Sequence, residues 1–406
     1  LEKFSTLVFH YYNESNLQAF SSWSNAFLYL NERQNGKRLI IVIDEFPYLV
    51  QKNRALLSEF QHLIDHQLKG GNLFIVLCGS YMGFMEKEVL GAKSPLFGRR
   101  TGQLHMKPFH YQTSLQFMDG FTDEEKLMLY GAFGGTPLYL QLIQNDKSWE
   151  ENIKHNFLKN TSYLYEEPLL LLRQEVQEPG VYSAIIEAIA NGYTKANEIS
   201  TKIGEDTAKC LKYIKILCEL GILYKETPFG EKESSRKTLY GISDLMFRFW
   251  YRYVFANRTL VETDASQAVW TKKIEPDYSN YMGLVFEKIC IDYLSMQNAK
   301  GNLPILFTSI GRWWGTDSKT RSQIEIDLIA NDGDDYIIGE CKWRNEKLDL
   351  SVFTSLKEKA DVYSKKRNHT WYALFSKSGF TDAVIEEAKK NDQLILVDLQ
   401  QLVQNR

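Results

Sequence analysis

The sequence predicts an α/β protein, and three observations lead to this prediction. First, residues 39–43 are five consecutive aliphatic residues, a pattern typical of a strand buried on both faces of a parallel sheet. Second, residues 72–80 contain a similar apolar run, and residues 56–68 between the two runs have helical spacing. Strand, helix and strand in this order predict a parallel sheet. Third, residues 324–330 and 336–343 predict two further strands near the C-terminus.

The composition narrows the class of protein. The 406 residues are enough for two or three domains, and a hydrophobic content of 44% allows packed cores. A net charge of -3 gives no overall basic field, so binding to nucleic acid would need a local patch. The five cysteines form no CxxC pair, which favours reduced thiols over disulfides or a zinc site. We find neither an apolar run long enough to span a membrane nor a signal peptide, so we expect a cytoplasmic protein without a membrane partner.

The chain begins with Leu1 rather than Met. Residues 4–9 have the composition of a strand that nothing precedes, so we expect an N-terminal truncation. We also expect a helix over residues 20–31 and a last strand of this region over residues 101–108.

Polar side chains follow both apolar runs. Asp44 and Glu45 come directly after the first run, and Ser80 ends the second. Ligands of open α/β sheets bind at the carboxyl ends of the strands, so we expect these three residues on one rim. An Asp there can hold Mg²⁺ through water, the next Glu can polarise an attacking water, and a hydroxyl can sense a γ-phosphate. The alternative is a buried strand that ends in an acidic turn.

A turn further along the chain carries Arg99 and Arg100. An arginine can stabilise the charge that develops in phosphoryl transfer, either in its own subunit or from a neighbouring one. The second case would require a homo-oligomer. The alternative is a solvated basic turn.

The order of these motifs resembles the archaeal-type ATPase family of the AAA+/STAND group. The motifs are Ile-Asp-Glu at 43–45, Leu-Cys-Gly-Ser at 77–80, Ser-Pro-Leu-Phe-Gly-Arg-Arg at 94–100 and Gly-Gly-Thr-Pro-Leu-Tyr-Leu at 134–140. The resemblance implies a P-loop NTPase-type domain with a helical lid that binds ATP and Mg²⁺. It also implies the following roles: Asp44 and Glu45 as the Walker B pair, Ser80 as sensor 1, Arg99 or Arg100 as the arginine position, and Gly134, Gly135 and Pro137 in the lid motif near the adenine.

One feature of that family is missing from this sequence. No G-x-x-x-x-G-K-[ST] motif occurs, and Gly-Ala-Lys-Ser at 91–94 lacks the earlier glycine and the preceding strand. Without a phosphate-binding loop and its lysine, tight ATP binding should fail. Two explanations stay open: the loop lies upstream of Leu1, or the chain is a degenerate ATPase that never binds nucleotide.

The middle of the chain predicts three short helices and a hairpin. The helices are expected over residues 182–190, 196–203 and 205–220, and the strands over 222–225 and 238–242, which is the winged-helix pattern. The third helix carries Lys209, Lys212 and Lys215 on roughly one face, the position of a DNA-reading helix. A solvated face balanced by acidic neighbours is the alternative. The aromatic residues 247–255 favour a buried linker helix over a platform for stacked bases.

The C-terminal strands carry a second candidate site. Asp327 lies on the first strand, and Glu340 and Lys342 lie two residues apart on the next. In the first strand, Ile324, Ile326 and Leu328 should face one way and Asp327 the other. Two carboxylates and the carbonyl of the residue between Glu340 and Lys342 could bind Mg²⁺, and the lysine could activate a water. The alternative is a surface hairpin with a Glu–Lys pair.

This pattern resembles the PD-(D/E)XK nuclease superfamily. The resemblance implies a restriction-endonuclease-like α/β domain in which Glu287, on the preceding helix, completes the metal ligands Asp327 and Glu340. We therefore predict an ATPase coupled to a DNA-binding domain with a Mg²⁺-dependent nuclease site. The alternatives are a nucleotide-controlled regulatory or partner-binding switch and a degenerate scaffold. The predicted domains are a partial ATPase core at 1–110, a helical lid at 111–178, a winged helix with a linker helix at 179–256, and a nuclease-like domain at 257–406.

Overall fold

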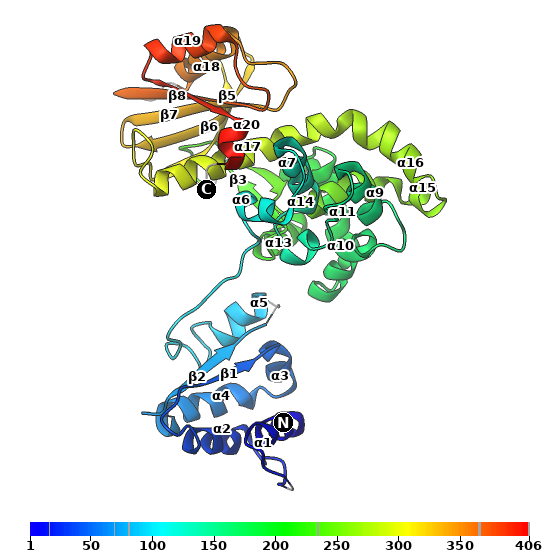
Figure 1. Cartoon of the computed structure of the whole chain (residues 1–406), viewed down its shortest axis with the longest axis vertical. Helices are drawn as coiled ribbons and strands as arrows, with labels where there is room; N and C mark the ends of the chain where they lie inside the picture. Colours follow the sequence, from blue (N-terminus) through cyan, green and yellow to red (C-terminus); the bar gives the residue numbers. More distant parts are fainter. Residues whose placement is uncertain (16, 69, 80–81, 234, 364–366, 405–406) are drawn as a thin grey trace. The chain divides into compact units, whose positions relative to one another are not determined.

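The computed structural model describes the whole chain except residues 16, 69, 80–81, 234, 364–366 and 405–406. The chain forms two compact units, Leu1–Met106 and Lys107–Arg406, which we call unit 1 and unit 2. Figure 1 shows the elements of each unit. The division into four domains stays a prediction.

Unit 1 is built on two parallel strands, as predicted. β1 (Leu39–Ile43) pairs with β2 (Leu73–Leu77) in register from Leu39–Leu73 to Ile43–Leu77. Ile41 and Ile43 pack into one core with the helices. The helical elements of unit 1 are α1 (Glu2–Tyr11), α2 (Trp23–Glu32), α3 (Phe46–Lys52), α4 (Ala55–His62), a π-helical turn (Leu63–Gln67), α5 (Met82–Phe84) and a second π-helical turn (Met85–Val89).

Three details of unit 1 differ from the prediction. The strand expected over residues 4–9 is wrong, because this stretch lies in α1, which buries Ser5, Val8 and Phe9 at helical spacing. The strand expected over residues 101–108 is also wrong. Its backbone pairs with no strand among the described residues, and a strand needs such a partner for its N–H and C=O groups.

The third difference concerns the burial of β1. We expected both faces to be buried, but the side chains of Ile40 and Val42 are 63% and 59% exposed. The core of unit 1 contains only the other face of the strand, Ile41 and Ile43. A continuous aliphatic run therefore did not distinguish a strand covered on one face from one covered on both.

Unit 2 begins with helices. α7 starts at a capping box in which Thr122 and Glu125 satisfy each other's backbone N–H groups. Helices lie on both sides of Gly134 and Gly135 and over most of residues 149–175. The first helices of unit 2 are α6 (Tyr111–Ser114), α7 (Asp123–Phe133), α8 (Pro137–Leu140), α9 (Trp149–Phe157) and α10 (Tyr163–Glu175).

Three helices and an antiparallel hairpin follow in the predicted order. They are α11 (Pro179–Ala190), α12 (Ala196–Ile203), α13 (Thr207–Glu219), β3 (Leu223–Glu226) and β4 (Leu239–Ile242). The aromatic stretch that follows contains α14 (Leu245–Phe249) and a π-helical turn (Trp250–Val254), and most of its side chains are buried. Burial excludes the base-stacking interpretation and agrees with the preferred one, a buried linker helix.

The C-terminal part of unit 2 is a five-stranded mixed sheet in the order β5-β6-β7-β8-β9. β5, β6 and β7 are antiparallel neighbours, and β7, β8 and β9 are parallel. The strands are β5 (Ser309–Thr316), β6 (Gln323–Asp332), β7 (Asp335–Lys342), β8 (His369–Ser376) and β9 (Leu394–Asp398), and the helices are α15 (Arg258–Glu262), α16 (Ser266–Val269), α17 (Glu275–Ala299), α18 (Leu350–Val362), α19 (Asp382–Lys390) and α20 (Leu399–Gln404).

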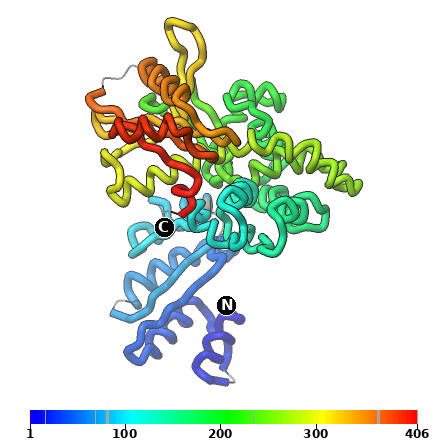
Figure 2. Tube along the Cα trace, turned by 45° about the horizontal axis from the view of Figure 1, so that its top comes forward, coloured from blue at the N-terminus to red at the C-terminus, as the bar shows by residue number. Residues whose placement is uncertain are grey.

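Helices cover both faces of this sheet. α17 packs on one face, in the cluster that contains Leu328 and Ala330, and α18 packs on the other, with Ile326 and Ile338. The C-terminal helix α20 lies against α7, near the start of unit 2 (Figure 2). The Tyr111 hydroxyl also donates to the Leu402 carbonyl over 3.0 Å.

The strict alternation expected along β6 is wrong. Ile326 belongs to the α18 face and Leu328 to the α17 face. Gly311 of β5 pairs with Ile329, and Trp313 of β5 pairs with Ile326. Two steps along β5 therefore correspond to three steps along β6, so β6 contains one extra residue, a β-bulge, at this point. Such a bulge moves the following side chains to the other face, and bulges are frequent next to functional sites.

Candidate functional site

In unit 1, the predicted acidic residues lie at the end of β1. Glu45 has a left-handed backbone (φ 51°, ψ 38°), and its N–H donates to Asp44 Oδ1 over 2.9 Å. The next N–H, of Phe46, donates to the Cys78 carbonyl at the end of β2 over 2.9 Å. A left-handed conformation is uncommon for residues other than glycine and tends to persist where the surroundings fix it, often at functional sites.

Gly79 brings the end of β2 against this acidic turn. A Cβ on Gly79 would lie 2.4 Å from Pro47 Cδ and 3.9 Å from Glu45 Oε2. Burial raises the pKa of the Cys78 thiol, and the nearby Asp44 carboxylate raises it further. The two strand ends therefore meet, as expected for parallel strands. The third predicted residue of this rim, Ser80, lies outside the described residues.

The two predicted arginines differ in what they contact. Arg99 donates from Nε and Nη2 to Asp65 over 2.9 and 2.7 Å, and from Nη1 to the carbonyls of Pro95 and Phe97. These bonds hold the turn that contains Arg99 closed. Arg100 is exposed, so of the two it is the better candidate to supply charge to a phosphate.

The glycine pair of the predicted lid motif has a packing role in unit 2. Gly134 ends α7 with φ 69°, and the Phe109 N–H donates to the Gly135 carbonyl over 2.8 Å. A Cβ on Gly135 would lie 2.0 Å from the Phe109 carbonyl oxygen. Pro137 stands in the first turn of α8, where its missing N–H costs nothing. Close backbone approach thus requires glycine at 135, whether or not a nucleotide binds nearby.

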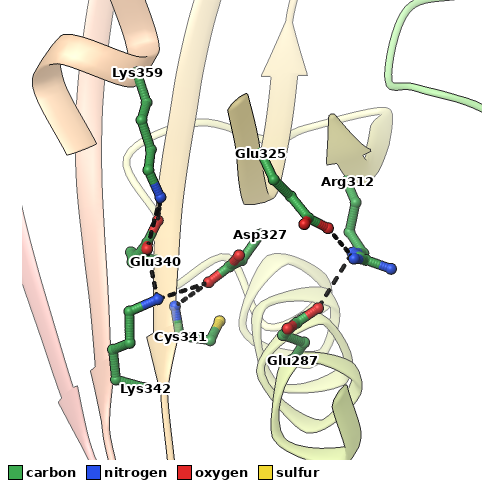
Figure 3. A network of polar contacts seen from close by, with 8 residues as sticks. All are labelled: Glu287, Arg312, Glu325, Asp327, Glu340, Cys341, Lys342 and Lys359. Carbon is green, nitrogen blue, oxygen red and sulfur yellow. Dashed lines mark hydrogen bonds and ion pairs between the residues drawn. The ribbon is translucent and has the colours of Figure 1, made fainter. Parts of the chain in front are cut away.

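In unit 2, the structure brings the predicted C-terminal residues together (Figure 3). Lys342 Nζ lies 2.6 Å from Glu340 Oε1 and 3.7 Å from Asp327 Oδ2. The ladder between β6 and β7 ends at the pair Leu328–Gly339, and beyond it the Asp327 carboxylate accepts the Cys341 N–H over 2.8 Å. The bulge in β6 therefore places a carboxylate where a backbone carbonyl would otherwise accept that bond.

Sequence reasoning missed Lys359 as a member of this group. Its Nζ lies 2.8 and 2.9 Å from the two Glu340 oxygens, and it reaches them from α18. Leu356 and Ala360 are buried under this helix. The helical spacing of those two residues was the available signal, because Lys359 lies beside Ala360 on the side of α18 that faces the sheet.

The surroundings of the site shift the pKa values of Asp327 and Lys342. Burial raises the pKa of Asp327 to about 6, and the charge of Glu340 acts in the same direction. Burial lowers the pKa of Lys342, but Asp327 and Glu340 outweigh burial and leave the pKa above its ordinary value. The two carboxylates and the Cys341 carbonyl are hard oxygen donors of the kind that Mg²⁺ prefers, and their repulsion is what a divalent cation would relieve.

Glu287 is held by a different partner. Its Oε2 lies 3.2 Å from Arg312 Nε, a residue of β5 that sequence reasoning also missed. Burial raises the pKa of Glu287 to about 8; Arg312 opposes this shift and Asp327 adds to it. Among the described side chains, no group of three or more His, Cys, Asp or Glu is arranged to hold a metal ion. The residues fit Mg²⁺ in chemistry, with Asp327 and Glu340 as the nearest donors.

Comparisons with known proteins agree with the motif order. Residues 2–143 match the model of an ATPase domain found predominantly in Archaea, and residues 250–359 match that of archaeal and bacterial proteins of unknown function. An uncharacterized protein of Methanocaldococcus jannaschii is 32% identical over 386 residues, which are 94% of this chain and 82% of the relative. The chain belongs to the archaeal-type ATPase family.

Two further similarities are weaker. An uncharacterized ATP-binding protein of Pyrococcus abyssi is 28% identical over 167 residues, 38% of this chain and 48% of that protein. A solved structure of a Vibrio cholerae protein aligns over 93% of this chain and 91% of its own, at 10% identity and a TM-score of 0.24, too low to indicate a shared fold. None of the described helices is both long and apolar enough to cross a membrane.

Proposed function

We propose that this ATPase family member couples ATP binding and hydrolysis to a Mg²⁺-dependent nuclease site that acts on DNA. The observation that carries the proposal is the group Asp327, Glu340 and Lys342 on two adjacent strands, in which the Lys342 ammonium lies within ion-pair distance of both carboxylates. This is the donor set of a nuclease that uses a hard cation and a lysine.

Each residue of this group would have a separate role in catalysis. Asp327, Glu340 and the Cys341 carbonyl would hold the ion, and the Cys341 N–H fixes the Asp327 carboxylate in orientation. Bound Mg²⁺ would supply charge stabilisation at the scissile phosphate and lower the pKa of a water. Lys342 would orient that water, because its ammonium already lies between the two carboxylates. Lys359 would place a second positive charge beside the phosphate.

In unit 1, Asp44 would hold the Mg²⁺ of the nucleotide and Glu45 would polarise the attacking water. Membership of an ATPase family and the fixed acidic turn at the end of β1 support this assignment. Glu45→Gln should therefore abolish ATP turnover. An ATP hydrolysis assay on wild type and variant tests it, and a variant that hydrolyses ATP as fast as an active wild-type protein would contradict the role of Glu45.

DNA would meet the three-helix module through α13. Lys209, Lys212 and Lys215 are exposed on this helix, although Lys209 and Lys215 also pair with the acidic residues Glu205 and Glu219. Such exposed ion pairs contribute little to stability, so DNA phosphates can replace the acidic partners of these lysines. The module would act as a winged helix that brings DNA to the C-terminal site.

The test is cleavage of plasmid DNA with and without Mg²⁺. Lys342→Met should lower the cleavage rate about a hundredfold or more, since it removes a positioned catalytic group. Lys347→Met changes an exposed lysine beyond the end of β7 and should leave the rate unchanged. Cleavage that persists in Lys342→Met and in Asp327→Ala would overturn the proposal, provided that both variants stay folded by circular dichroism.

One observation favours a second function. Glu340 is already paired with both Lys342 and Lys359, so the site is neutralised internally. A regulatory switch would use the same residues for structure only, with nucleotide state controlling DNA or partner binding. That function predicts Mg²⁺-independent DNA binding and no nicking by the wild-type protein.

A further inference from the structure

Arg312 lies at the centre of a second charged group, next to the proposed nuclease site. Its guanidinium contacts three carboxylates from three different elements: Glu226 of β3 at 3.4 Å, Glu287 of α17 at 3.2 Å, and Glu325 of β6. The Arg312 side chain is 15% exposed; Glu226 and Glu287 are similarly buried, whereas Glu325 is 50% exposed. One buried cation thus serves two buried carboxylates.

The β3–β4 hairpin is tied to Arg312 in two ways. Besides the ion pair from Glu226, the Phe229 N–H in the hairpin loop donates to the Arg312 carbonyl over 2.7 Å. β5 is the edge strand of the sheet, so this bond uses a carbonyl that no strand of the sheet takes. A movement of the hairpin would therefore act on both the backbone and the side chain of Arg312.

Glu226 and Glu287 depend on the same guanidinium. Arg312 meets Glu226 with Nη1 and Glu287 with Nε, and these nitrogens belong to one rigid plane. A buried carboxylate is costly without a paired charge, so neither carboxylate can lose Arg312 freely. Turning the plane toward one carboxylate turns it away from the other.

Glu287 in turn lies next to the proposed metal ligands. The charge of Asp327 acts on Glu287 across the α17 face of the sheet, and Figure 3 shows Arg312 joined to both Glu287 and Glu325. Ion pairs therefore join the hairpin to Glu287 through Arg312, and the electrostatic interaction between Glu287 and Asp327 extends this link to the proposed metal site.

We propose that Arg312 is a positioning residue that couples the β3–β4 hairpin to the C-terminal site. Glu226 and Glu287 share its guanidinium, so a displacement of the hairpin reorients Glu287 beside Asp327. The catalytic consequence rests on the proposed nuclease function, whereas the coupling itself does not.

A double-mutant cycle measures the coupling without any assay of activity. Glu226→Gln or Glu287→Gln alone leaves Arg312 one buried carboxylate, but both together leave it only the exposed Glu325. The double variant should therefore lower the thermal unfolding midpoint by more than the sum of the two single shifts. The matched control pairs Glu226→Gln with Glu386→Gln, an exposed residue of α19 that bonds Lys389, and should be additive. Additive shifts in the Glu226/Glu287 cycle overturn the proposal.

The second arm asks whether the coupling reaches the metal site. Glu226→Gln should raise the Mg²⁺ concentration for half-maximal DNA cleavage several-fold, while Glu325→Gln should leave it unchanged. A merely structural Glu226 would not move this value, so an unchanged Mg²⁺ requirement in Glu226→Gln also overturns the positioning role. If the wild-type protein does not cleave DNA at all, the proposed function fails, and the unfolding cycle still decides whether Arg312 couples the hairpin to Glu287.

Discussion

Gly135→Ala tests whether the lid glycine is a packing residue. The new Cβ would lie 2.0 Å from the Phe109 carbonyl oxygen, 2.9 Å from its N and 3.0 Å from its carbonyl carbon. These are backbone atoms, so the clash cannot be relieved by turning a side chain. Forced overpacking costs about 1–3 kcal/mol, and losing the Phe109–Gly135 hydrogen bond costs about 0.5–1.5 kcal/mol more. We expect unit 2 to lose about 2–4 kcal/mol of unfolding free energy.

Urea unfolding followed by tryptophan fluorescence is the appropriate assay. Every tryptophan except Trp23 lies in residues 107–406, so the signal reports mainly on unit 2. Gly283→Ala is the control, because this glycine lies inside α17 and a Cβ there would meet nothing within 4 Å. The control should gain up to about 1 kcal/mol from better helix propensity. A Gly135→Ala protein that is as stable as wild type but no longer binds ATP would refute the reasoning and favour the adenine-binding role.

Three further predictions concern charged residues. Arg99→Met should speed hydrogen–deuterium exchange over residues 94–100, because Arg99 closes that turn, whereas Arg100→Met should not. Lys359→Met leaves the buried Glu340 with one cation fewer and should cost about 1–3 kcal/mol in urea unfolding. Burial raises the pKa of Asp277, but hydrogen bonds from a tyrosine and an arginine outweigh burial and lower it. The stability from Asp277 is therefore present above its unfolded pKa of about 3.9 and is lost as the pH falls below that value. Asp277→Asn should lose less stability than wild type across this acid range, measured by thermal unfolding against pH.

The sequence predicted elements well where local pattern decides structure. The parallel pair β1 and β2, the three helices with a hairpin, and the strands of the C-terminal site all lie within a few residues of the expected ranges. The sequence predicted elements poorly where their formation depends on a tertiary partner. Residues 101–108 alternate like a strand, yet Leu104 and Met106 are 82% and 74% exposed because no partner strand pairs with this stretch among the described residues.

The candidate sites follow the same rule. Asp327, Glu340 and Lys342 could be brought together from strand periodicity and one hairpin, because their separation is short. Arg312 could not, because it reaches Glu287 from another strand, and nothing in the spacing specifies which strand will pack there. For Lys359, helical spacing indicated the side of α18 that faces the sheet, but not the carboxylate that the lysine would meet. Nor could the bulge in β6 be predicted, since it depends on the register with β5.

The charged side chains of the C-terminal site are difficult to explain by their contribution to folding stability alone. Asp327 and Glu340 are buried, and the lysines that neutralise Glu340 give up hydration and side-chain freedom to do so. Apolar residues of similar volume often stabilise such positions equally well or better. Burial raises the pKa of Asp327 and the charge of Glu340 adds to this shift, whereas Lys342 and Lys359 oppose it. A bound cation would relieve the remaining repulsion between Asp327 and Glu340, which is the physical argument for the proposed Mg²⁺ site.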